Sequence, residues 1–328
     1  MQERVRFVVP GDQPAQVQGS PQLARLAPYG EVTVYTDRPA DTAEQLRRVR
    51  DAHVILNSRG AVRWPGELLR QLPHLRLICA FAVGTDSIDL AAARELGITV
   101  CNVPGRTAPM VAEHALALML AVAKRVVYQT DELRAGRWGS KPDNIYLHGK
   151  TLGIIGLGNI GSRVAALGRA IGMRVVAWTF HPSPERAARL GVTLVELDDL
   201  LRQSDVVSLH LRLTEQSRGL IGARELGLLK PGAILVNTAR GPLVDEAALV
   251  AALEAGHLAG AGLDVFAIEP LPADAPILRC RQIVLTPHNA DTTPEGIEAV
   301  NEGAIDNAIA FLEGRPQNVV AGPATAMS

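Results

Sequence analysis

Short apolar runs and longer helical stretches alternate along this chain, which is the pattern of a protein with parallel β-sheets. Strand-like runs in the first part of the chain lie at 5–9, 32–35, 53–56, 75–80 and 98–101. A second series lies at 151–155, 173–178, 206–210, 233–237, 259–265 and 283–286. Each series therefore predicts a sheet of the α/β class.

A breaker and a long helical segment separate the two series. Residues 103–105 (Val-Pro-Gly) mark a candidate domain boundary. One helix is predicted from residue 107 or 108 to about residue 136, apolar on more than one side and so buried between domains or subunits. His114 on this helix is interpreted as a satisfied core or interface histidine. Residues 137–150 are expected to cover a site or embrace a partner subunit, and a final helix at 294–313 precedes an extended tail.

Gly156, Gly158 and Gly161 form a Gly-x-Gly-x-x-Gly motif between a strand-like run and a helical stretch at 163–172. The first glycine would allow a tight turn, the second a close approach to a pyrophosphate, and the third close packing of the helix on the strand. The N–H groups at the helix start would receive the negative charge. The motif predicts dinucleotide binding, with a purely structural turn or another nucleoside ligand such as S-adenosylmethionine as the alternatives.

Composition narrows the class of protein. A chain of 328 residues suggests two domains at about 150 residues each. Hydrophobic residues make up 47% and aromatic residues only 4%, so small aliphatic side chains must build the core. A formal net charge of -1 argues against nucleic acid or an acidic membrane surface as the main partner.

Cysteine usage and the apolar segments bear on the compartment. Cys79, Cys101 and Cys280 are scattered among apolar runs, so they are interpreted as buried thiols rather than as disulfides or a metal site. The N-terminus has no signal-peptide core. The longest apolar helix candidate, 115–123, is far shorter than the roughly 20 residues of a membrane span. A soluble, cytoplasmic protein is therefore expected.

Three residues that could carry chemistry follow successive strand-like runs in the second half: Arg240, Glu269 and His288. Strand ends at one edge of a parallel sheet converge, so these residues could share a site. Singly, each has an ordinary interpretation as a surface charge, a loop carboxylate or a turn cap. Together, beside a dinucleotide motif, Arg would bind a substrate carboxylate, His would transfer a proton, and Glu would favour protonation of His.

Loops at 57–60 and 81–86 also follow strand-like runs, and Gly84 could let adjacent N–H groups hold a small anion, with an ordinary turn as the alternative.

Six motifs lie in a fixed order along the chain: VGTDSID at 83–89, VAEH at 111–114, GIIGLGNIG at 153–161, LVNTARGPLVD at 235–245, GLDVF at 262–266 with EP at 269–270, and TPH at 286–288. Through these motifs the chain resembles the D-isomer-specific 2-hydroxyacid dehydrogenases over nearly its whole length.

The resemblance implies two doubly wound parallel-sheet domains, with a Rossmann nucleotide domain (103–290) inserted into a flavodoxin-like substrate domain (1–102 and 291–328). It implies an active site in the cleft between domains that close by hinge motion. Arg240 would bind the carboxylate and polarise the carbonyl, and His288 would be the acid/base. Glu269 would orient His288 and keep it protonated.

The same resemblance implies the binding residues and the assembly. Val83 and Gly84 would hold the substrate carboxylate through their backbone, and Asp264 would receive the nicotinamide carboxamide. The cofactor would be NAD, with NADP not excluded. The other predicted cofactor contacts are Thr107, Gly156, Gly158, Asn159, Ile160, Gly161, Thr179, His210, Arg212, Thr238 and Ala239. Family members are usually homodimers joined through nucleotide-domain helices and a crossover arm, here 107–150.

Departures from the family pattern bear on specificity. Thr179 and Phe180 stand where an acidic residue usually binds the ribose hydroxyls. Arg212 replaces a common Pro, so Arg212 or His181 is expected to give some tolerance of a 2′-phosphate. Asn57, a substrate-binding candidate, stands where phosphoglycerate-type relatives often have Arg, which disfavours a phosphorylated substrate although Arg59 is close in the sequence.

Two hypotheses of different classes follow. The leading one is an oxidoreductase that interconverts a small 2-oxo acid and its D-2-hydroxy acid, of the glyoxylate or hydroxypyruvate reductase type or the D-glycerate or phosphoglycerate dehydrogenase type. The alternative is a dinucleotide-sensing binding protein like the C-terminal-binding corepressors, which share the fold and the catalytic trio. Since this sequence adds no disordered tail, the enzyme is favoured, and turnover of a 2-oxo acid distinguishes the two.

Overall fold

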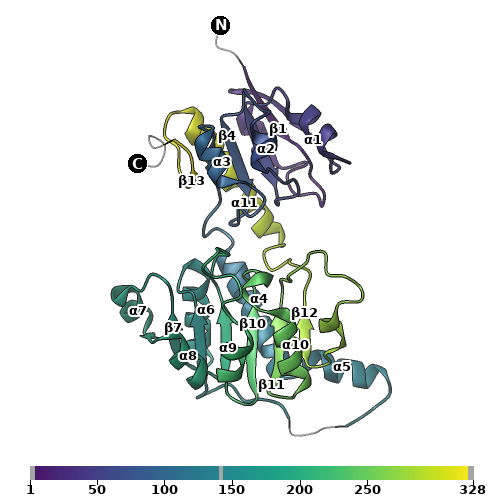
Figure 1. Cartoon of the computed structure of the whole chain (residues 1–328), viewed down its shortest axis with the longest axis vertical. Coiled ribbons are helices and arrows are strands. Elements are labelled where there is room, and N and C mark those ends of the chain that lie inside the picture. Colours follow the sequence, from purple (N-terminus) through teal and green to yellow (C-terminus); the bar gives the residue numbers. More distant parts are fainter. Residues whose placement is uncertain (1–3, 140–142, 324–328) are drawn as a thin grey trace. The chain divides into compact units, whose positions relative to one another are not determined.

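The computed structural model describes residues 4–139 and 143–323 (Figure 1). The chain forms two compact units, unit 1 from Met1–Thr107 with Thr292–Ser328 and unit 2 from Ala108–Asp291. The chain thus crosses between the units at 107/108 and at 291/292. The boundaries expected from the sequence were 102/103 and 290/291.

Unit 1 is built on a six-stranded sheet with the strand order β13-β5-β4-β3-β1-β2. The strands are β1 (Val5–Val9), β2 (Gly30–Val34), β3 (Val54–Ser58), β4 (Leu77–Phe81), β5 (Thr99–Cys101) and β13 (Val319–Ala321). The first five are parallel in the order 2-1-3-4-5, which is a doubly wound, flavodoxin-like arrangement. The tail, expected to be only extended, pairs as β13 antiparallel to β5 and so covers that sheet edge.

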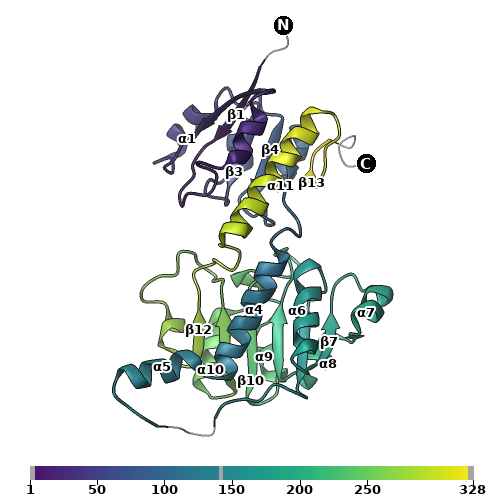
Figure 2. The ribbon, with the colours of Figure 1, turned by 180° about the vertical axis from the view of Figure 1, so that it is seen from behind.

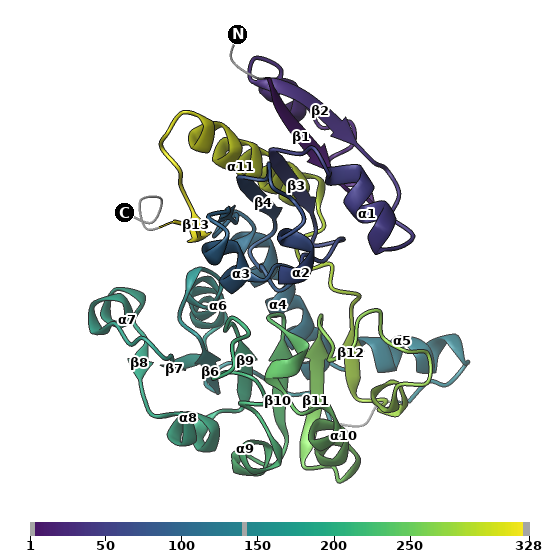
Figure 3. The same cartoon turned by 45° about the horizontal axis from the view of Figure 1, so that its top comes forward.

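Helices cover both faces of the unit 1 sheet, as the opposite views in Figures 1 and 2 and the tilted view in Figure 3 show. Ile78 of β4 belongs to the core beneath one group of helices, and its neighbour Cys79 belongs to the core on the other face. Successive residues therefore face opposite layers, and both layers are made of buried hydrophobic side chains. The first group is α1 (Thr42–Val49), α2 (Gly66–Leu69) and α3 (Leu90–Glu95); the second is the 3-10 helix η1 (Pro21–Leu26) and α11 (Pro294–Leu312).

Unit 2 is built on a seven-stranded sheet with the order β12-β11-β10-β9-β6-β7-β8. The strands are β6 (Thr151–Ile155), β7 (Arg174–Trp178), β8 (Thr193–Leu194), β9 (Val206–Leu209), β10 (Ala233–Asn237), β11 (Leu258–Leu263) and β12 (Ile283–Leu285), all parallel. Strand order reverses between β6 and β9, which is the Rossmann topology. The carboxyl ends of the strands at this reversal are where such sheets bind ligands.

Two helical layers enclose the unit 2 sheet. Ile154 packs toward α4 (Ala108–Ala123), α6 (Asn159–Ala170) and α7 (Pro184–Leu190), while Ile155 packs toward α8 (Leu197–Gln203), α9 (Ala223–Leu228) and α10 (Glu246–Glu254). Figure 2 shows α4 and α6 side by side on the first of these faces. Contact between α4 and β11 is close, because a Cβ on Gly262 would lie 2.8 Å from the Cβ of Leu118.

The single long helix predicted from residue 107 to 136 is wrong, since the structure divides it into α4 and α5 (Val126–Arg134). Arg125 between them has φ 52° and ψ 35°, a left-handed conformation that no α-helix continues through. The carbonyl of Ala123 accepts from the Ile145 N–H, and that of Lys124 accepts from the Gln129 side chain. These carbonyls at the end of α4 thus bind donors outside the helix, which helical periodicity cannot reveal.

The three cysteines are free thiols and are buried, as expected. Two short elements, α7 and β8, lie in a stretch where the sequence pattern indicated no element. The helix after the glycine turn begins at Asn159 rather than at residue 163. Within the described residues no helix is both long and apolar enough to cross a membrane.

Candidate active site

The glycine motif forms the turn from β6 into α6, at the point where the unit 2 strand order reverses. Gly156 has φ 100°, and a Cβ there would lie 2.7 Å from the carbonyl oxygen of His210. A Cβ on Gly161 would lie 2.0 Å from the carbonyl oxygen of Gly156. A Cβ on Gly158 would meet no described atom within 4 Å. The protein itself requires glycine at 156 and 161, whereas position 158 is open to a ligand.

The start of α6 supplies backbone donors beside this open position. Gly158 is the N-cap, and no described side chain caps the helix there. The first N–H groups of a helix lack partners within it, so those of Asn159, Ile160 and Gly161 are available to an acceptor. Such donors at a helix N-terminus suit a phosphate group. This set of groups fits the pyrophosphate of a dinucleotide.

The loop after β7 holds the residues predicted near the ribose. Thr179 is half-buried and His181 is exposed, while the ring of Phe180 packs edge-on against Trp178 with centroids 4.8 Å apart. Sequence reasoning missed Arg186 in the first turn of α7. Its Nη1 donates to the carbonyl of Leu157, inside the glycine turn, at 3.0 Å. No helix was predicted there, so the sequence pattern gave no signal for this contact.

The end of β9 carries His210 and Arg212. The backbone N–H of His210 donates to the carbonyl of Ile155 at 2.7 Å, which ties β9 to the glycine turn. Burial lowers the pKa of the His210 imidazole to about 3, so this ring is neutral and shares a hydrogen bond of 2.9 Å with the Ser208 hydroxyl. Arg212 is exposed on the following loop.

The loop after β10 is folded by Asn237, the last residue of the strand. Its Nδ2 donates to the carbonyl of Arg240 at 2.9 Å, and its Oδ1 accepts from the N–H of Ala239 at 3.0 Å. These local bonds bend the chain so that Arg240 leaves the strand end. The Thr238 hydroxyl is buried without a hydrogen-bond partner among the described residues, which leaves one polar group for a bound molecule or water.

Gly241 brings the Arg240 loop against the loop that holds Glu269. A Cβ on Gly241 would lie 1.9 Å from the carbonyl carbon of Phe266, so only glycine permits this approach. The N–H of Phe266 in turn donates to Oε1 of Glu269 at 2.9 Å. Two loops from neighbouring strand ends are thus held together through backbone contacts.

Glu269 and His288 form the central contact of the site. Oε2 of Glu269 lies 2.7 Å from Nδ1 of His288, and their side chains are 36% and 44% exposed. His288 has φ 52°, a left-handed backbone that costs a non-glycine residue free energy and persists only where the surroundings impose it. The structure therefore holds the imidazole in one orientation against the carboxylate while leaving it accessible.

The carboxyl of Glu269 is ionised near neutral pH. Partial burial opposes ionisation, but hydrogen bonds from His288 and the Phe266 N–H outweigh it, and the charges of His288 and Arg240 add to them. The pKa of Glu269 is consequently lower than its ordinary value. Both the imidazole of His288 and the guanidinium of Arg240 act on this carboxylate, so the three predicted residues lie close enough to interact.

Asp264, after β11, makes contacts that sequence reasoning did not foresee. Its carboxylate is buried and accepts from the Thr286 hydroxyl at 2.6 Å and from the N–H groups of Asn289 and Ala290 at 3.0 and 3.1 Å. Since a carboxylate has about four acceptor positions, roughly one is left for the predicted nicotinamide carboxamide. Most of the bonding capacity of Asp264 is used on the segment that carries His288.

The remaining predicted residues belong to unit 1. Asn57, at the end of β3, is buried, and its Nδ2 donates to the Ser87 hydroxyl at 3.2 Å. Val83 and Gly84 are half-buried in the loop after β4, and the carbonyl of Val83 accepts from the Asn102 side chain at 2.6 Å. Thr107 is buried immediately before α4.

Known proteins are similar to this chain in sequence and in fold. A sequence model of the D-isomer specific 2-hydroxyacid dehydrogenase NAD binding domain matches residues 116–290. The glyoxylate reductase of Aeropyrum pernix is 42% identical over 311 residues, which cover 91% of this chain and 92% of that protein. The glycerate dehydrogenase of Methylorubrum extorquens is 39% identical over 287 residues, covering 84% and 88%.

A solved structure agrees with the sequence matches. The D-lactate dehydrogenase of Aquifex aeolicus, complexed with NAD and lactic acid, aligns with a TM-score of 0.84 at 29% identity over 98% of this chain and 100% of that one. The chain belongs to the D-isomer-specific 2-hydroxyacid dehydrogenase family. The family and the doubly wound fold class predicted from the sequence are both confirmed.

Family membership settles the class of reaction. The chain is an oxidoreductase that interconverts a 2-oxo acid and its 2-hydroxy acid with a nicotinamide dinucleotide, as the sequence predicted. The segment that matches the NAD-binding domain of this dehydrogenase family contains the glycine turn together with Arg240, Glu269 and His288. The candidate catalytic residues of unit 2 therefore all lie within the segment that the family model matches.

Proposed function

We propose that this dehydrogenase acts on a small, unphosphorylated 2-oxo acid such as glyoxylate or hydroxypyruvate, with Arg240, Glu269 and His288 as its catalytic residues. The observation that carries the proposal is the 2.7 Å contact between Glu269 and His288 in the unit that contains the glycine turn. Two similar proteins are named glyoxylate reductase and glycerate dehydrogenase, after small unphosphorylated acids, and these names support the proposed substrate class. Asn57 is neutral and buried, so it offers no charge for a phosphate.

Each catalytic residue has a task that its contacts support. Because Nδ1 of His288 is engaged by Glu269, Nε2 is the nitrogen that exchanges a proton with the substrate oxygen. The ionised Glu269 stabilises the protonated imidazole and fixes its orientation. Arg240 presents a planar guanidinium to the substrate carboxylate and carbonyl. The bound nicotinamide supplies or accepts the hydride.

The substrate carboxylate is also assigned to the backbone of Val83 and Gly84. The loop after β4 suits this role because glycine lets an anion approach the peptide N–H groups. Asn57 completes the proposed substrate residues.

NAD is the proposed cofactor, with some tolerance of NADP. Between β7 and α7 the sequence has no carboxylate to bind the ribose hydroxyls or to repel a 2′-phosphate. The proposed contacts are the glycine turn with Asn159 and Ile160, Thr107 before α4, and the residues that follow strands, Thr179, His210, Arg212, Thr238, Ala239 and Asp264. His210 contributes as a neutral ring.

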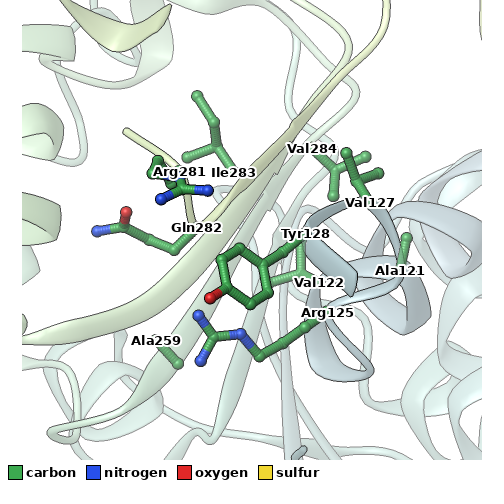
Figure 4. Close-up of a pocket in the computed structure, with 10 residues that line it drawn as sticks. All are labelled: Ala121, Val122, Arg125, Val127, Tyr128, Ala259, Arg281, Gln282, Ile283 and Val284. Atoms are coloured by element: carbon green, nitrogen blue, oxygen red, sulfur yellow. The ribbon is translucent and has the colours of Figure 1, made fainter. Parts of the chain in front are cut away.

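A homodimer is proposed, joined through α5 and the segment after it. Val126, Val127 and Leu133 on α5 are 51%, 44% and 54% exposed, and Trp138 is 92% exposed. Figure 4 shows a pocket between the α4–α5 corner and the strands β11 and β12, where the Tyr128 ring lies between the guanidinium groups of Arg125 and Arg281. Such a set of apolar and aromatic side chains is typical of a surface that a partner covers.

A cytoplasmic location is also proposed, because three buried cysteines that stay free thiols fit a reducing compartment.

A panel of 2-oxo acids, each assayed with NADH and with NADPH, tests the proposal. We expect turnover of glyoxylate or hydroxypyruvate, a loss of at least about 100-fold in kcat for His288→Ala, and a higher KM for Arg240→Ala. His257→Ala, which changes a histidine at the amino end of β11, serves as the control. Binding of NADH without turnover of any acid, or an active His288→Ala variant, contradicts the proposal.

A further inference from the structure

His114 on α4 lies beside the loop that carries His288. Its Nε2 is 2.9 Å from the Thr286 hydroxyl and 3.6 Å from Oδ1 of Asp264. The packing explains this position: Leu118, one turn later on the same face of α4, rests against Gly262 of β11. Asp264 stands two residues after Gly262, so His114 lies over the strand end.

The direction of each hydrogen bond follows from the chemistry of the groups. The Thr286 hydroxyl donates its single proton to the carboxylate of Asp264. The same hydroxyl oxygen must then accept from His114, which fixes the proton of His114 on Nε2. A relay therefore runs from the His114 N–H through the Thr286 O–H to the Asp264 carboxylate.

The Asp264 carboxylate accepts hydrogen bonds from residues on both sides of His288 in the chain. Thr286 precedes His288 by two residues, and Asn289 and Ala290, which also donate to Asp264, follow it directly. Between these hydrogen-bonded residues His288 has a left-handed backbone with φ 52°, and its Nδ1 lies against Glu269. Without these hydrogen bonds a non-glycine residue would relax toward the ordinary regions of backbone conformation.

We propose that His114 and Thr286 are positioning residues for His288. Through the buried Asp264 they hold the loop 286–290 in the strained form that keeps the imidazole on Glu269. His114 does this from α4, the helix that begins where the chain enters unit 2, and Ala290 lies just before the chain leaves it. The inference rests on the proposed catalytic role of His288 and adds two residues that do not touch the reacting atoms.

Two paired substitutions test the relay. Thr286→Val keeps the shape of the side chain and removes the hydroxyl, whereas Thr286→Ser keeps the hydroxyl. His114→Phe keeps a ring and removes the donor, and His114→Gln retains an N–H donor at a shorter reach. The control is His257→Gln, which removes an imidazole that contacts the Leu226 carbonyl at 3.2 Å at the other end of β11.

The readouts are kcat and KM for the 2-oxo acid, the dissociation constant of NADH from fluorescence titration, and the melting temperature. A displaced imidazole should lower kcat of Thr286→Val and His114→Phe by about 10- to 100-fold, with the NADH dissociation constant within about threefold of the wild type. Thr286→Ser should recover most of the lost kcat, and His257→Gln should leave it unchanged.

Several results would overturn the inference. One is a kcat of Thr286→Val and His114→Phe within about twofold of the wild type. Another is a loss confined to NADH affinity with full kcat at saturation, because the relay would then serve the cofactor. If His114→Phe does not fold, Thr286→Val against Thr286→Ser decides alone. An active His288→Ala variant would instead refute the proposed function, so the two failures are distinct.

Discussion

Oε2 of Glu269 and Nδ1 of His288 are 2.7 Å apart, and the Glu269 carboxyl has a pKa below its ordinary value. The carboxylate of Glu269 holds the imidazole of His288 in one orientation for proton transfer. In Glu269→Gln we expect kcat for reduction to fall by about 10- to 100-fold, because the ring is no longer held against a charged acceptor. Steady-state kinetics of the two proteins measure this, and a kcat within about twofold of the wild type would contradict the role of Glu269.

The same contact links the stability of unit 2 to pH. Because folding lowers the pKa of Glu269 from 4.5, the ionised carboxylate contributes stability above pH 4.5, and this contribution is lost as pH falls through the lower folded value. Thermal unfolding should therefore separate the wild type from Glu269→Gln at neutral pH and bring the two together in acid. A gap that widens on acidification would contradict the assignment. Because the side chain is more than one third exposed, solvent screening keeps the effect small.

Substitution by alanine at two glycines of the same motif should affect different properties, stability at one and NADH binding at the other. Gly161→Ala places a Cβ 2.0 Å from a carbonyl oxygen, so we expect a loss of about 1–3 kcal/mol in the free energy of unfolding, or more if the backbone cannot shift. Gly158→Ala meets no described atom, so stability should stay within about 0.5 kcal/mol while NADH binds about tenfold more weakly. Denaturant unfolding and fluorescence titration measure the two quantities. Equal effects of the two variants on stability would refute this division of roles.

Arg186 should affect the choice between the two dinucleotides. Its guanidinium is anchored to the Leu157 carbonyl and has further N–H donors, in a loop region without a carboxylate. In Arg186→Ala we expect the dissociation constant of NADPH to rise about tenfold and that of NADH by less than threefold. Arg189→Ala, one turn later on α7, is the matched control. If NADPH affinity responds to Arg212→Ala and not to Arg186→Ala, the earlier hypothesis for Arg212 holds instead.

The proposed dimer surface is tested with one exposed leucine in each unit. Leu133 on α5 is 54% exposed and Leu96 in unit 1 is 41% exposed. Leu133→Glu should produce monomers in sedimentation velocity, because a charge placed in an apolar interface loses its hydration on association. Leu96→Glu should leave the assembly unchanged. A monomeric wild type would exclude the proposed homodimer.

Local chemistry explains what could be predicted for the fold. Buried parallel strands are short apolar runs, so most strands lie within a few residues of their predicted positions. The break at Arg125 and the pairing of β13 were not predicted, because both depend on hydrogen bonds with residues far along the chain. Periodicity records which face of a segment is apolar, and it contains no information about such partners.

The amino-acid sequence by itself determined the strand and turn pattern, the three glycines with their separate tasks, and the residues Arg240, Glu269 and His288 at strand ends. Each of these follows from local rules, since a glycine turn or a strand end needs only its neighbours in the chain. Only the tertiary structure revealed that Asp264 accepts hydrogen bonds from the His288 loop. The same is true of the contact of His114 with Thr286 and of Arg186 with Leu157. The physical reason is that these side chains meet across elements separated by tens to hundreds of residues, where only the packed sheet and its helices set the distance.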